Sequence, residues 1–104
     1  MLSERDICDI RDCIADHLHP EKIVLFGSYA EDRATDDSDI DLLVVMASDL
    51  NQLKRNVAVK RLFSNRTFSL DAFVFTPEEV AMYGEVKGTL IYKALQAGRV
   101  IYEH

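Results

Sequence analysis

Two aspartates spaced by one residue are the strongest chemical signal in the sequence. Asp39 and Asp41 come just before an apolar run, residues 42–46, that has the composition of a buried strand. Because side chains alternate along a strand, we expect both carboxylates on one face, roughly 7 Å apart. Like charges on a buried strand need a positive charge to offset them, and oxygen-only ligands favour a hard cation such as Mg²⁺ or Mn²⁺.

A Gly-Ser pair stands ten residues before the first of these aspartates and directly after the apolar run 22–26. Gly27 allows a close approach of the backbone to a ligand, which a Cβ atom would block. Ser28 adds a hydroxyl and an N–H group at the expected start of a short helix, where phosphate binds readily. The pair alone would indicate a plain turn, but its spacing from the aspartates favours phosphate binding.

A third acid lies inside the apolar segment 67–75, which we predict to be a strand. Asp71 is expected on the same face as Ser69, Phe73 and Phe75, and an acid in such a strand requires a partner. A metal ion and a salt bridge to a lysine or arginine are the two alternatives.

The G-S pair, ten residues and then D-I-D resembles the signature of the minimal nucleotidyltransferases (MNT) in the DNA polymerase beta superfamily. The apolar runs on both sides agree with the resemblance, which covers nearly the whole chain. It implies a small mixed sheet with helices packed mainly on one side. It also implies that Asp39, Asp41 and Asp71 are catalytic ligands of two Mg²⁺ ions, or of Mn²⁺, and that Gly27 and Ser28 hold the β and γ phosphates of ATP.

The molecule that accepts the nucleotide is inferred from the domains that this chain lacks. Relatives that modify antibiotics or extend RNA generally carry further domains, for which we expect no room in 104 residues. The chain resembles the MNT antitoxin of a toxin–antitoxin pair, which implies transfer of AMP from ATP to a tyrosine of a HEPN-domain toxin. A non-catalytic antitoxin that inhibits its partner by binding, and a small-molecule or regulatory nucleotidyltransferase acting alone, are the alternatives.

The turn departs from the family pattern at one place. Relatives commonly read G-S-x-A-R-G, whereas this chain has Glu31-Asp32 in place of Arg-Gly and places Arg33 two positions later. An acid where a base is usual would weaken triphosphate binding by repulsion. This departure is the reason for keeping the non-catalytic alternative.

The bulk composition limits the possible functions. A chain of 104 residues is expected to form one domain over residues 1–104, and its net charge of −6 argues against direct nucleic-acid binding. No apolar run approaches the ~20 residues of a membrane span, and the charged N-terminus lacks a signal-peptide pattern, so we expect a cytoplasmic protein. Cys8 and Cys13 have no second pair, which indicates free thiols rather than a zinc site.

Alternating helix and strand patterns must position these residues, and they predict an α/β or α+β fold. A helix is expected between the N-cap Ser3 and Pro20, and a second helix over residues 50–64 with an apolar stripe that includes Leu50, Leu53 and Val57. The expected strands are residues 22–26, 39–46, 67–75 and 100–102. Two further helices are expected between the last two strands, the first capped by Thr76 and the second stopped by Gly98. The second helix and the residues just beyond it form the only basic part of the chain (Lys54, Arg55, Lys60, Arg61 and Arg66), and one or two of these side chains are candidates to reach a triphosphate.

Overall fold

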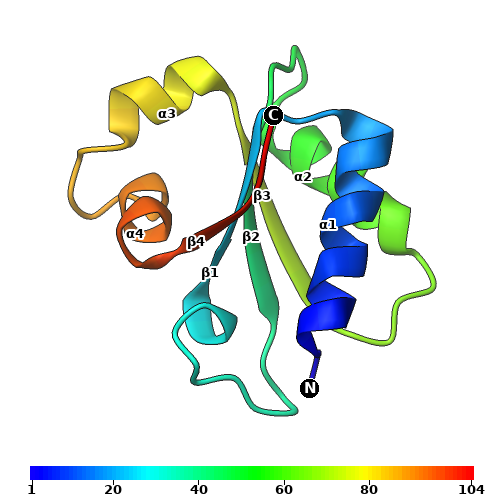
Figure 1. The fold of residues 1–104 in the computed structure, drawn as a ribbon. Helices are drawn as coiled ribbons and strands as arrows, with labels where there is room; N and C mark the ends of the chain where they lie inside the picture. Colours follow the sequence, from blue (N-terminus) through cyan, green and yellow to red (C-terminus); the bar gives the residue numbers. More distant parts are fainter.

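The computed structural model describes residues 1–104 and has a four-stranded sheet between two layers of helices (Figure 1). The strands are β1 (Lys22–Phe26), β2 (Ile40–Val45), β3 (Leu70–Phe75) and β4 (Arg99–Glu103). The helices are α1 (Glu4–Leu18), α2 (Gln52–Lys60), α3 (Pro77–Tyr83) and α4 (Leu90–Ala97), and 3₁₀ turns at Gly27–Tyr29 and Arg61–Phe63 follow β1 and α2. None of these helices has both the length and the apolar composition that crossing a bilayer requires.

The sheet is mixed, with the strand order β3-β2-β1-β4. β1 runs antiparallel to both β2 and β4, whereas β2 and β3 are parallel. The predicted α+β class is therefore confirmed. The two longer helices, α1 and α2, pack on one face, and the shorter α3 and α4 cover the other face, so helices lie on both sides rather than mainly on one (Figure 1).

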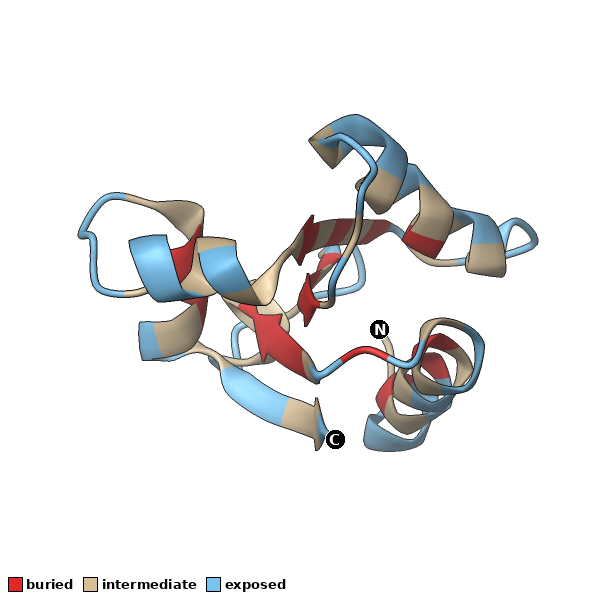
Figure 2. Ribbon diagram, turned by 90° about the horizontal axis from the view of Figure 1, so that it is seen from above, coloured by how far each residue is buried: buried red, intermediate tan, exposed pale blue.

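Alternation along β2 explains why both faces are covered. Ile40, Leu42 and Val44 pack in the core cluster that includes α1 and α2, whereas Leu43 and Val45 pack in a second cluster with α4. Each of these side chains is 5% exposed or less. The buried class, red in Figure 2, is concentrated in the strands of the sheet and on the inner sides of the helices. A central strand that is apolar on both faces requires a helical layer on each of them.

The predicted N-terminus and apolar stripe of the second helix are wrong. α2 begins at Gln52, with Asn51 as its N-cap, and Val59 is its one fully buried residue. Leu50, Leu53 and Val57 are instead exposed, Leu53 by 74%. The apolar period is present in the sequence, but it does not mark the side of the helix that contacts the sheet.

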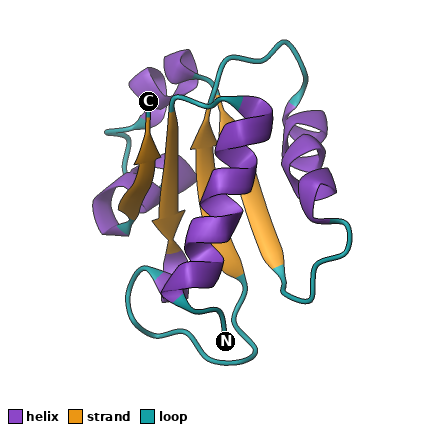
Figure 3. Cartoon of the chain, turned by 45° about the vertical axis from the view of Figure 1, so that its right-hand side comes forward, coloured by secondary structure: helices purple, strands orange, loops and turns teal.

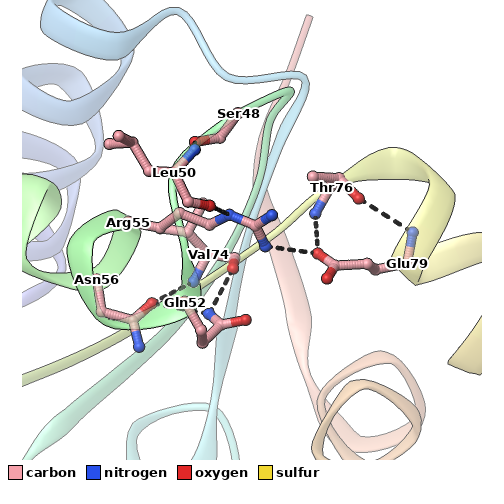
Figure 4. Close-up of polar contacts among 8 residues, drawn as sticks. All are labelled: Ser48, Leu50, Gln52, Arg55, Asn56, Val74, Thr76 and Glu79. Atoms are coloured by element: carbon pink, nitrogen blue, oxygen red, sulfur yellow. Dashed lines mark hydrogen bonds and ion pairs between the residues drawn. The ribbon is translucent and has the colours of Figure 1, made fainter.

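Polar side chains hold the first half of α2 on the outer edge of β3 (Figure 4). Gln52 Nε2 donates to the carbonyl oxygen of Val74 at 2.6 Å, and Asn56 Oδ1 accepts from the Val74 N–H at 2.8 Å. Arg55 adds an ion pair of 2.7 Å to Glu79 in α3. These bonds satisfy backbone groups that an edge strand would leave open, and they fix α2 beside β3.

Candidate functional site

The ends of three strands bring the candidate residues together. The last residue of β1, Phe26, pairs with Asp41 near the start of β2, and Asp41 pairs in register with Asp71 in β3. Gly27 directly follows Phe26, so it lies at the same end of the sheet, which is the lower end in Figure 3. Adjacent strands are about 4.8 Å apart, which places the backbones of the two paired aspartates side by side.

Asp41 and Asp71 also share one face of the sheet. In β2, Asp41 alternates with Ile40 and Leu42, which face α1 and α2, so its side chain lies on the opposite face. In β3, Asp71 alternates in the same way with Leu70 and Ala72. Both carboxylates therefore lie on the face that α3 and α4 cover.

Asp39 lies one residue before β2, in the exposed end of the preceding loop. The strand therefore starts one residue later than the sequence predicted. The negative charge of Asp39 nevertheless contributes to raising the pKa of Asp41.

Gly27 is required where it stands. Its φ of +75° is in the left-handed region, which side chains rarely adopt, and a Cβ atom there would collide with Oδ2 of Asp41. The close approach observed here is between the turn and the Asp41 carboxylate, and the expected approach to a phosphate stays a prediction. Any larger residue would displace the acid from its position.

The pKa of the Asp41 carboxyl is raised from its ordinary value of 3.8 to about 6. Burial is the largest cause, because it removes water from the charged form, and the neighbouring charges of Asp71 and Asp39 add repulsion. Lys93 in α4 acts in the opposite direction. A carboxylate with this environment, next to two others, is typical of a functional site.

Asp71 has the salt-bridge partner that the sequence analysis kept as an alternative. Nζ of Lys60, in the last turn of α2, lies 4.0 Å from Oδ1 of Asp71. The two side chains are 40% and 43% exposed, so solvent and ions reach the pair. Asp71 can therefore pair with Lys60 and still bind a metal ion, because an exposed lysine can be displaced.

The donor chemistry of the site suits a hard cation, since Asp39, Asp41 and Asp71 offer only oxygen atoms. Burial and the neighbouring negative charges raise the pKa of Asp41, so a bound cation would favour its charged form. No three His, Cys, Asp or Glu side chains converge closely enough in this conformation to form a complete metal cage. Mg²⁺ keeps several waters in proteins and needs few carboxylates, so the two paired aspartates fit its requirements.

The turn after β1 is the expected short helix, a single 3₁₀ turn that contains Gly27 and Ser28. The N–H of Glu31 donates to the carbonyl of Gly27, and the N–H of Arg33 donates to the carbonyl of Ser28. The side chains of Glu31 and Arg33 form an exposed ion pair of 3.3 Å. The charge of the unexpected acid is thus partly offset by the displaced arginine.

Sequence reasoning did not single out two lysines near the carboxylates. Lys60 was one of five basic residues around the second helix, and nothing in the pattern distinguished it from Lys54. Lys93 is an exposed residue of α4, and no local signal marks its approach to Asp41. Both positions depend on how the helices pack on the sheet.

Three solved structures share this fold at low sequence identity. A candidate nucleotidyltransferase from Sulfolobus solfataricus is 23% identical, with a TM-score of 0.63 over 92% of this chain and 76% of that one. A mutant of the toxin–antitoxin complex MntA-HpeT is 22% identical, with a TM-score of 0.63 over 100% and 75%. A toxin–antitoxin complex with AMP-PNP is 21% identical, with a TM-score of 0.67 over 99% and 75%.

The sequence comparison is more specific than the likeness in fold. Among curated protein sequences, none matches this chain. The family described as polymerase beta, nucleotidyltransferase, however, matches residues 9–104. Because that match spans nearly the whole sequence and includes every candidate residue of the site, the chain belongs to the polymerase beta nucleotidyltransferase family.

Proposed function

We propose that the protein is a metal-dependent nucleotidyltransferase that transfers AMP from ATP to the hydroxyl of a tyrosine of a HEPN-domain toxin and releases pyrophosphate. The observation that carries the proposal is the pairing of Asp41 with Asp71 across β2 and β3, with Gly27 packed against Asp41. Membership of the family supports the reaction class. Fold likeness to toxin–antitoxin complexes, one of them with AMP-PNP, motivates the choice of partner and nucleotide.

The candidate residues have two roles in this proposal, metal binding and phosphate binding. Asp39, Asp41 and Asp71 are the catalytic metal ligands, for two Mg²⁺ ions or for Mn²⁺. Bound metal would neutralise the charge of the triphosphate and lower the pKa of the attacking hydroxyl. Gly27 and Ser28 hold the β and γ phosphates, and Gly27 supports this role because a Cβ atom at that position would collide with Asp41 and disturb the turn that carries Ser28.

The charge of the chain supports a protein rather than a nucleic acid as partner. A net charge of −6 would repel a phosphate backbone, whereas it suits a basic protein surface. We place the protein in the cytoplasm, as one member of a hetero-oligomer with its toxin.

One observation favours a second candidate, an antitoxin of the same fold that inhibits by binding alone. Arg33 is the only arginine in the turn, and it is paired with Glu31 rather than free to meet a triphosphate. A turn without a free cation would bind ATP weakly. In that case the carboxylates would be retained without supporting transfer.

Mass spectrometry of the toxin separates these candidates. The wild-type protein, incubated with a HEPN-domain toxin, ATP and Mg²⁺, should add the mass of one or more AMP groups to the toxin. Asp71→Asn should add none while ATP binding stays measurable, and Asp37→Asn, in the exposed loop, should behave as wild type. A wild-type protein that adds nothing, yet silences the toxin at a stoichiometric ratio, would establish the binding-only candidate in place of ours.

A further inference from the structure

One stripe of α2 faces the edge of β3, and it ends at the candidate site. Gln52, Asn56 and Lys60 follow one another at intervals of four residues, so they lie on the same side of the helix. The first two bond the carbonyl and the N–H of Val74, as described above. Lys60, the third, reaches Asp71 on the same strand.

The position of Lys60 is therefore set by a rigid attachment rather than by chance on the surface. The bonds to Val74 fix α2 along β3, and Val59, the neighbour of Lys60, is fully buried in the core. The ion pair of Arg55, whose side chain is only 12% exposed, holds the same helix to α3. Together these contacts leave the Lys60 ammonium beside a carboxylate of the site, at 4.0 Å.

We propose that Lys60 is a positioning residue that acts as the resident cation of Asp71 and must be displaced when a metal ion binds there. This inference rests on the proposed function, because it assigns Asp71 to the metal site. Without metal, the ammonium offsets one of the three mutually repelling carboxylates and holds Asp71 in place. With metal, the ammonium and the divalent ion repel each other across a few ångströms, so Lys60 lowers the metal affinity of the empty site.

The consequence is a site in which one of the three carboxylates, Asp71, is offset while the site is empty, and which does not load metal at low concentration. The exposure of both side chains makes the exchange feasible, since water can solvate the ammonium as it leaves. Lys60 thereby sets the metal concentration at which the third carboxylate is engaged. No residue of the G-S-x₁₀-D-x-D motif has this role.

Isothermal titration calorimetry with Mn²⁺ alone, without nucleotide, tests the inference. Lys60→Met should bind Mn²⁺ roughly three- to tenfold more tightly than wild type, because one nearby positive charge has been removed. Two controls should bind Mn²⁺ within about twofold of wild type. Lys60→Arg keeps the charge at this position. Lys54→Met removes a charge from the same helix, but that charge is exposed and forms no ion pair. Urea denaturation in EDTA should confirm that all variants are folded, and Lys60→Gln replaces Lys60→Met if the latter is not.

The outcomes distinguish this inference from the proposed function. If wild type binds Mn²⁺ but Lys60→Met binds it equally or more weakly, Lys60 is only a structural residue and the inference is overturned, while the metal site stands. If Lys54→Met tightens binding as much as Lys60→Met, the effect comes from net charge and the inference also fails. If no variant binds Mn²⁺, the proposed function falls and this inference with it.

Discussion

Asp41 should destabilise the metal-free protein, so that Asp41→Asn should make it more stable. The pKa of this carboxyl is about 6 in the folded protein, against an ordinary value of 3.8. Between these two pH values the folded state holds more protons than the unfolded state, so the stability of the wild type falls as the pH rises. Above about pH 6 the charge is present in both states and is costlier in the folded one, whereas below about pH 4 Asp41 is neutral in both.

The size of the effect follows from the shift in pKa. A change of about two units corresponds to about 3 kcal/mol as an upper limit, at 1.36 kcal/mol per unit. Asp41 is only half-buried, so solvent screens part of this energy, and the new amide must find hydrogen-bond partners. We therefore expect a gain of about 1 to 2 kcal/mol at pH 8, or a rise in melting temperature of about 5 to 10 °C for a domain of this size.

Urea denaturation followed by circular dichroism, in EDTA at several pH values between 4 and 8, measures this gain. The difference between Asp41→Asn and wild type should grow as the pH rises through about 6 and should vanish near pH 4. Asp37→Asn is the matched control, because Asp37 is an exposed acid of the preceding loop, and it should change the free energy of unfolding by less than about 0.5 kcal/mol. A mutant less stable than wild type at pH 8, or a gain that is the same at pH 4 and pH 8, would refute the reasoning.

Three other predictions test the site and the core. Millimolar Mg²⁺ or Mn²⁺ should raise the melting temperature of the wild type by relieving repulsion between the carboxylates, and Asp39→Asn should remove most of that rise; a wild-type melting curve that ignores metal and nucleotide would count heavily against the site. Gly27→Val should abolish ATP binding in calorimetry, since the added atoms collide with Asp41 and strain a turn with φ of +75°, and undiminished binding would rule out the phosphate role. Val59→Ala should lower the free energy of unfolding, measured by urea denaturation, by about 1 to 2 kcal/mol, because Val59 is buried. Leu53→Ala should change it by less than about 0.5 kcal/mol, because Leu53 is exposed. Similar losses for the two variants would contradict the packing of α2.

Local signals were sufficient for the elements that depend on local structure. Ser3 and Asp6 form the capping box that begins α1, as their spacing suggests, and the apolar run 22–26 coincides with β1. The prediction that the apolar stripe of α2 faces the core was wrong, because the first half of this helix contacts the sheet through Gln52 and Asn56. A periodic pattern of apolar residues predicts a helix well, but the direction in which the helix faces depends on which partners the strand edge offers.

The sequence by itself determined the types and the spacing of the residues that carry the chemistry. Gly27, Asp39 and Asp41 lie close together in the chain, so a turn and one strand are enough to bring them to one end of a sheet. Asp71 and Lys60 are far from them in the chain, and only the tertiary structure decided their positions. The parallel register of β2 and β3 places Asp71 opposite Asp41, and the attachment of α2 to Val74 brings Lys60 to Asp71. The physical reason is that the pKa of Asp41 is raised by its burial and by the charges near it. Both depend on which strands pair and which helices pack on the sheet, and no local pattern encodes these contacts.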